Sequence, residues 1–344
     1  MVRVLLTGGS GFIAAHVLDT LLEHGHSVVT TVRSQEKADQ IKQAHPKYGN
    51  DKLAFAIVED IGKEGAFEQA VISDPPFEAV IHTASPFHFN VTDVQKELYD
   101  PAIIGTTDIL KSIKKSTPSV KRVVITSSFA AIINPFKGGP WAGHTYNEED
   151  WNPITHEQGL KDAANAYRAS KTLAEKAAWE FLEKEKPNFT ISTMNPPMVF
   201  GPVVHYLNSL SALNTSNQII NNMVQGKCRD EIPATTAYLW IDVRDLAVAH
   251  VKAIEAPDAA NKRFFVTAGH YTNKEVADIL RKNFPEYASQ LPTESTPGGH
   301  YPEGGTSAVH GYDNSRAKEV LGLKFRPLEE SIIDTAKSLI AVGG

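Results

Sequence analysis

A tyrosine and a lysine four residues apart, Tyr167 and Lys171, have the types and spacing needed for proton transfer. Side chains at positions i and i+4 of a helix lie on one face, within reach of each other. A phenol has a pKa near ~10 in water, and a neighbouring ammonium favours the phenolate and brings that pKa toward neutrality. The pair therefore predicts a general acid, Tyr167, activated by Lys171.

Two consecutive serines, Ser127 and Ser128, end an earlier run of β-branched residues. A hydroxyl at that position can polarise a substrate carbonyl while the tyrosine protonates the developing alkoxide. Because successive side chains of a strand point to opposite faces, only one of the two serines can face the site. Together these residues predict carbonyl reduction by hydride from a nicotinamide cofactor.

A glycine-rich run directly follows the first apolar segment and precedes a helical pattern. Its glycines let the chain turn sharply, and the helix N-terminus offers N–H groups and a positive dipole end to a pyrophosphate. The run fits both Gly9-x-Gly11-x-x-Ala14 and Gly8-x-x-Gly11-x-x-Ala14. The cofactor contacts predicted here are Thr7, Gly8, Gly11, Phe12 and Ile13.

The end of the second expected strand carries no acid that could bond the ribose hydroxyls of NAD. Arg33 and, one helical turn later, Lys37 could instead pair with a 2′-phosphate, with the hydroxyl of Ser34 as a further donor. This pattern favours NADP(H). The alternative is that these residues form an ordinary solvated helix start.

Two further strand ends add cofactor contacts. Asp60 is placed to bond the adenine amino group, and small residues after the fourth strand would let the backbone lie against the cofactor. The contacts expected there are Asp60, Ile61, Thr83, Ala84 and Ser85. We expect His82 to be a packed core histidine, and no histidine spacing matches a metal motif, so we expect no metal site.

Short β-branched runs alternate with helical patterns, which predicts parallel βαβ units. The expected strands are 2–6, 27–32, 54–58, 79–81, 123–126 and 191–194. The expected helices are 11–23, 35–44, 99–116, 163–185, 245–255, 273–283 and 328–340. We predict an α/β fold with a doubly wound parallel (Rossmann) sheet and a smaller C-terminal substrate-binding lobe. We expect residues 1–200 to form the NADP-binding domain, with returning segments near 240–268, and 201–344 to be mostly the smaller lobe.

The 344 residues carry a net charge of -6, which offers no basic surface for nucleic acid or anionic lipid. No apolar run approaches the ~20 residues of a membrane helix. The single cysteine, Cys228, cannot form an internal disulfide, and the chain opens without a basic leader, so we expect a cytoplasmic protein. The expected partner is a small carbonyl substrate, and a homodimer stays open.

These motifs resemble the extended short-chain dehydrogenase/reductase family, in the branch of dihydroflavonol reductases and fungal aldehyde reductases. The segments that carry the resemblance are Gly11-Phe12-Ile13-Ala14, Arg33-Ser34-Gln35-Glu36-Lys37-Ala38, His82-Thr83-Ala84-Ser85-Pro86-Phe87, Thr126-Ser127-Ser128, Glu175-Lys176-Ala177-Ala178-Trp179-Glu180-Phe181-Leu182 and Ile241-Asp242-Val243-Arg244-Asp245. The resemblance implies that Ser128 is the catalytic serine. It also implies that Pro196 and Val199 touch the nicotinamide, Val199 through its backbone.

The chain departs from the family pattern at Ala102, where an asparagine often completes the catalytic group. Proton resupply is then expected through Lys171 and the ribose to water. Phe129 and Met198 stand where a fungal member of the branch has tyrosine, which makes the expected pocket less polar. The candidate substrate wall, any member of which could instead be core, is Phe87, Phe89, Phe129, Met198 and Tyr206.

Other activities occur on the same fold. A dehydratase of this family needs an Asp-Glu pair beside the serine, and the residues after Ser128 include none. Epimerases usually retain NAD, which Arg33 argues against. A non-catalytic NADP sensor generally loses the tyrosine and lysine, which this chain keeps. The favoured function is an NADPH-dependent carbonyl reductase for small or aryl-bearing aldehydes, ketones or keto esters.

Overall fold

The central element is a seven-stranded parallel sheet in the order β3-β2-β1-β4-β5-β7-β10. The computed structural model describes residues 1–344 except 86–92, 205–212 and 344. The strands are β1 (Arg3–Thr7), β2 (Ser27–Val32), β3 (Leu53–Ile57), β4 (Ala79–His82), β5 (Arg122–Thr126), β7 (Thr190–Met194) and β10 (Lys262–Phe264). The strand order reverses between β1 and β4, and ligands of such sheets lie beyond the carboxyl ends of the strands at that point. The predicted doubly wound fold is confirmed.

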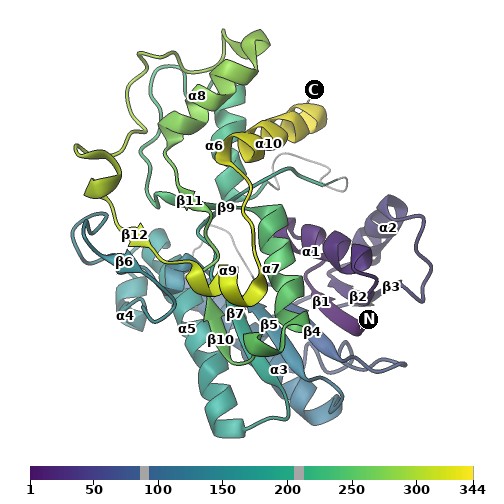
Figure 1. Ribbon diagram of the computed structural model, residues 1–344. Coiled ribbons are helices and arrows are strands. Elements are labelled where there is room, and N and C mark those ends of the chain that lie inside the picture. Colours follow the sequence, from purple (N-terminus) through teal and green to yellow (C-terminus); the bar gives the residue numbers. More distant parts are fainter. Residues whose placement is uncertain (86–92, 205–212, 344) are drawn as a thin grey trace.

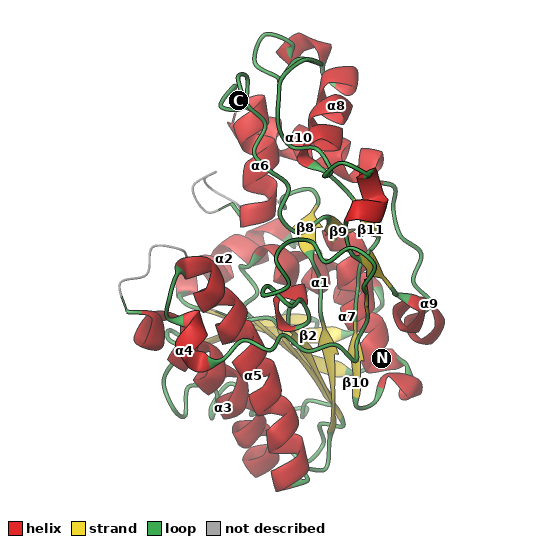
Figure 2. Cartoon of the chain, turned by 90° about the vertical axis from the view of Figure 1, so that its left-hand side faces the viewer, coloured by secondary structure: helices red, strands yellow, loops and turns green. Residues whose placement is uncertain are grey.

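Helices cover both faces of this sheet (Figures 1 and 2). They are α1 (Phe12–Glu23), α2 (Gln35–Ala44), α3 (Asp100–Ser116), α5 (Ala163–Glu185) and α7 (Val243–Glu255). Val4 and Leu6 pack in one core with α1 and α7, whereas Leu5 packs in a second core with α3 and α5. This alternation follows from the two-residue period of a strand, and burial of both faces explains the continuous apolar strands.

A third core lies outside the central sheet, in the part drawn above it in Figure 1. It packs α6 (Thr215–Val224), α8 (Asn273–Asn283) and α10 (Leu328–Gly343) beside a small sheet of β8 (Met198–Phe200), β9 (Leu239–Asp242) and β11 (Gly269–His270). The remaining α-helices and strands of the described chain are α4 (His156–Gly159), α9 (Ser315–Leu321) and the pair β6 (Thr145–Tyr146) and β12 (Gly311–Tyr312). Among the described residues, no helix is both long and apolar enough to cross a membrane.

Local capping fixes the helix that carries Tyr167 and Lys171. Asp162 caps α5 by accepting the backbone N–H of Asn165 at 2.8 Å, and the helix ends at Lys186, which adopts a left-handed conformation before Pro187. These signals place the boundaries of α5 at the predicted residues. The boundaries of the other expected elements match or differ by a few residues. The strands β6 and β8 to β12 and the helices α4, α6 and α9 were not predicted.

Candidate active site

The turn between β1 and α1 requires glycine at two positions. Gly8 has a φ of +75°, and a Cβ there would lie 3.0 Å from Cα of Ala84. A Cβ on Gly9 would lie 2.1 Å from Oγ1 of Thr30, so the loop can cross β2 only without a side chain. The N-cap of α1 is Gly11, which makes no side-chain capping bond. The first N–H groups of α1 therefore stay available for an anion.

Thr7 joins the carboxyl end of β1 to that of β4. It does not line the cavity described in the next paragraph. Its hydroxyl oxygen accepts the N–H groups of Thr83 and Ala84, both at 3.1 Å, and lies 2.9 Å from Nδ1 of His82. Thr7 is fully buried, and its contact with the cofactor stays a prediction. His82 is buried, as expected, and burial, together with the charge of Lys171, lowers the pKa of His82 to about 3.

A cavity of about 270 Å³ extends from this loop across the carboxyl ends of β4, β5 and β7. The predicted site residues that line it are Gly8, Gly11, Phe12, Ile13, Thr83, Ser85, Ser128, Tyr167, Lys171, Pro196 and Val199. It is also lined by Asn214, Thr215 and Ser216, which sequence reasoning missed. Of the other predicted cofactor contacts, Ala84 packs closely against Gly8. The residues that do not line this cavity are Ala84, Thr7, Arg33, Lys37, Asp60 and Ile61.

The two adjacent serines face different surroundings. The hydroxyl of Tyr167 donates to Oγ of Ser128 over 3.4 Å, a long hydrogen bond. Oγ of Ser127 instead donates to the buried carboxylate of Glu175 over 2.5 Å. The geometry thus pairs Ser128, rather than Ser127, with the tyrosine.

Burial dominates the electrostatics of the tyrosine and lysine. It raises the pKa of Tyr167, and the hydrogen bond with Ser128 offsets part of that rise. In the structure the pKa of Tyr167 is therefore raised overall rather than brought toward neutrality. Burial also lowers the pKa of Lys171 to about 8, while its Nζ donates to Oγ of Ser85 over 2.9 Å.

The backbone of Val199 is engaged by the first turn of α6. Its N–H donates to Oγ of Ser216 at 3.1 Å, and its carbonyl accepts Nδ2 of Asn214 at 3.2 Å. A carbonyl oxygen has two lone pairs, so one acceptor position remains for a ligand. These bonds join β8 to the residues at the start of α6 that complete the cavity.

The residues expected at the adenosine end lie on the surface. Arg33 is exposed and makes no ion pair within the described chain. Ser34 caps α2 by accepting the N–H of Lys37 at 3.4 Å, and Nζ of Lys37 donates to Gln40 at 3.1 Å. Asp60 is exposed and accepts the N–H of Gly62 at 2.9 Å.

A second cavity, of about 450 Å³, adjoins the first. Both share Ser128, Tyr167, Pro197, Thr215 and Ser216 as lining. Met198 and Phe129 line the second cavity, as expected of a substrate wall. Phe129 is also a core residue, because it is 4% exposed and stacks on Phe265 with ring centroids 5.0 Å apart. Phe87, Phe89 and Tyr206 lie outside the described residues.

A model of the NAD dependent epimerase/dehydratase family matches residues 4–268. The chain belongs to this family. Ketoreductase azaE of Aspergillus niger is 44% identical over 339 residues, which cover 98% of this chain and 97% of that protein. The NADPH-dependent methylglyoxal reductase GRE2 of Saccharomyces cerevisiae is 39% identical over 351 residues, 99% of each chain. The crystal structure of Gre2 from Candida albicans in complex with NADPH superposes with a TM-score of 0.90, at 36% identity over 100% of both chains.

The match to the epimerase/dehydratase family covers the glycine loop and the tyrosine and lysine, but ends before α8. The relatives extend the similarity over almost the whole chain, including the start of α6. Asn214 and Ser216 could not have been found from the sequence. Their hydrogen bonds to Val199 mark them, and no spacing rule encodes those bonds.

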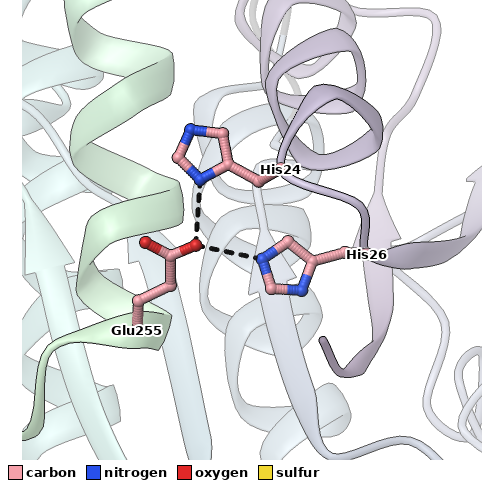
Figure 3. A group of neighbouring side chains, drawn as sticks. All are labelled: His24, His26 and Glu255. Carbon is pink, nitrogen blue, oxygen red and sulfur yellow. Dashed lines mark hydrogen bonds and ion pairs between the residues drawn. The ribbon is translucent and has the colours of Figure 1, made fainter.

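Within the described residues, three side chains at the amino edge of the sheet lie close enough together to hold a metal ion. Figure 3 shows His24 and His26 pointing at one carboxylate oxygen of Glu255, at 2.9 and 3.2 Å. Nδ1 of His26 accepts the N–H of Val2, so its Nε2 carries the hydrogen that Glu255 receives. Lys252 binds the other carboxylate oxygen at 2.9 Å. These bonds satisfy the carboxylate without an ion and tie α1 and β2 to α7.

Proposed function

We propose that the chain is an NADPH-dependent carbonyl reductase in which Tyr167 is the general acid. One observation carries this proposal. Ser128 and Tyr167 lie where a cavity along a dinucleotide-type glycine loop meets a second cavity. A carbonyl held at that junction would reach both hydroxyl groups and the cofactor cavity.

The residues of the first cavity fit a dinucleotide. The uncapped N-terminus of α1 and the side-chain-free approach at Gly8 and Gly11 suit a pyrophosphate. Arg33 and Lys37 would receive the 2′-phosphate, and the adenine would lie near Asp60. Further contacts would come from Ile61, Thr83, Ala84, Ser85, Pro196 and Val199, with Phe12 and Ile13 beside the phosphates. When bound, NADPH supplies hydride to the carbonyl carbon.

The chain's own groups would then manage the oxygen of the substrate. Ser128 donates a hydrogen bond that polarises the carbonyl, and the phenol of Tyr167 gives its proton to the developing alkoxide. The raised pKa of Tyr167 keeps the phenol protonated at neutral pH, as an acid in the reducing direction must be. The ammonium of Lys171 stabilises the phenolate that remains.

Reduction is favoured over the other activities of the family. Among the described residues, neither cavity is lined by a carboxylate that could abstract a proton from a substrate carbon. The relatives azaE and GRE2 are named as a ketoreductase and a methylglyoxal reductase. The second cavity, lined by Phe129, Ile133 and Met198, suits small or aryl-bearing aldehydes, ketones and keto esters.

The proposal extends to organisation and location. Residues 1–200, with segments near 240–268, would bind the cofactor, and most of 201–344 would close over the substrate. The net charge of -6 and the single buried cysteine support a cytoplasmic enzyme that binds a small carbonyl compound rather than nucleic acid. A homodimer is compatible with this proposal.

The test is loss of NADPH absorbance with a panel of aldehydes, keto esters and diketones. Tyr167→Phe removes only the hydroxyl, so turnover should fall by roughly a hundred- to ten-thousandfold. Urea unfolding of both proteins checks that the variant folds. Failure of the whole panel, or a variant as active as wild type, would refute the proposed reductase.

A further inference from the structure

A single charged side chain, Arg168, lines the second cavity among the residues described. It directly follows Tyr167 in α5. The other described lining residues are apolar or neutral. A cation in such a wall has no counter-ion there, so it favours a ligand that carries an oxygen acceptor or a negative charge.

The guanidinium lies over the first turn of α5. Its Nη1 donates to Oδ1 of Asn165 over 3.1 Å, one turn back along the helix. Side chains of a helix lean toward its N-terminus, and Ala164, four residues before Arg168, also lines the cavity. Arg168 therefore lies in the same wall of the cavity as Ala164 and Tyr167.

The acidic group that acts on Arg168 is already engaged. Oδ1 of Asp162 accepts the backbone N–H of Asn165 at 2.8 Å, and Oδ2 accepts Nδ2 of Asn165 at 2.7 Å. Burial lowers the pKa of Arg168, and the charge of Asp162 offsets part of this effect. Within the described chain the guanidinium of Arg168 donates one hydrogen bond, to Asn165, so most of its five N–H donors remain for a ligand.

We propose that Arg168 binds an oxygen acceptor that the substrate carries next to the carbonyl being reduced. The substrate class is then 2-oxo acids and their esters. This inference rests on the reductase function proposed above, because the same cavity must hold the reacting carbonyl at Ser128 and Tyr167. A carboxylate gains a charge-assisted, two-point bond, an ester carbonyl gains a single weaker bond, and a simple ketone gains neither.

The test compares three substrates of similar size: phenylglyoxylate, its methyl ester and propiophenone. Arg168→Met keeps the length of the side chain and removes its charge. Relative to propiophenone, kcat/KM of the variant should fall by roughly ten- to a hundredfold for the acid and by roughly two- to tenfold for the ester. The loss should appear mainly in KM, because the contact forms in the ground state as well as in the transition state.

Two controls separate this role from a structural one. Arg168→Lys keeps the charge but loses the planar fork, so its value for the acid should lie between those of wild type and Arg168→Met. Added salt should raise the wild-type KM for the acid much more than for propiophenone.

Each remaining outcome is decisive. Unchanged ratios, or an equal loss for all three compounds, would overturn the role of Arg168. Reduction of propiophenone without reduction of either 2-oxo compound would do the same. A wild-type protein that reduces none of the three would instead count against the reductase function.

Discussion

Two neighbouring serines should give opposite results when each is changed to alanine. Ser128→Ala removes the hydroxyl that faces Tyr167, and loss of one such donor costs roughly a hundred- to a thousandfold in kcat. Its cost in stability should be small, because within the described residues the hydroxyl otherwise accepts only the N–H of Ala130, at 3.1 Å in a three-residue turn.

Ser127→Ala should act on stability instead. Its hydroxyl donates a hydrogen bond to the buried carboxylate of Glu175. That carboxylate also accepts hydrogen bonds from Asn195, Thr193 and Arg263, at 2.7, 3.0 and 2.6 Å. A hydrogen bond to a charged group contributes about 1.5 to 3 kcal/mol. The other donors remain, so we expect a loss at the lower end, about 1.5 to 2 kcal/mol.

For both variants the assay measures kcat for the reduction of an aldehyde and the free energy of unfolding in urea. Ser128→Ala should lose turnover and keep its stability, and Ser127→Ala should do the reverse. Comparable losses of kcat in the two variants, or full activity of Ser128→Ala, would refute the assignment of the serines.

Two further predictions concern charged groups. Arg33→Ala should weaken NADPH binding by roughly ten- to a hundredfold and NADH binding far less, by fluorescence titration; equal losses would contradict the 2′-phosphate assignment. Desolvation raises the pKa of Glu255, but hydrogen bonds from His24, Lys252 and His26 outweigh it and lower that pKa to about 2. This stabilisation is present above the unfolded pKa near ~4.3 and is lost as the pH falls toward the folded value. Glu255→Gln should therefore cost about 1 to 2 kcal/mol at neutral pH, discounted for partial exposure, and urea unfolding should show the gap closing in acid. A gap independent of pH would disprove it.

The sequence predicted most of the fold because its local signals agree with the tertiary structure. The apolar runs are buried on both faces of the sheet, and α2, α5 and α8 carry capping residues where the helical pattern begins. The strands β8 and β9 were missed because each is short and its partner is distant in sequence. Pairing of Val199 with Ile241 depends on tertiary contacts that no local period reveals.

The sequence predicted those site residues whose type and spacing are fixed by the chemistry. Tyr167, Lys171 and the glycine loop follow fixed spacings, and the structure places them around one cavity. The electrostatics could not be predicted in the same way, because the pKa of Tyr167 depends on burial, which spacing does not report. For the same reason Arg168, an unremarkable residue inside a catalytic motif, gains meaning only from the cavity that it lines.

The buried ion pair beneath the site explains why the two serines differ. Glu175 follows Lys171 by one helical turn in α5, and its carboxylate meets Arg263 of β10 at 2.6 Å. The guanidinium of Arg263 lies 3.7 Å above the ring of Trp151. Glu175 also receives Ser127, at the end of β5, so it joins α5 to the carboxyl end of the sheet. Since breaking a buried pair leaves an uncompensated charge, this joint resists displacement. It therefore holds α5 in the position that lets Tyr167 reach Ser128 while Ser127 is turned away.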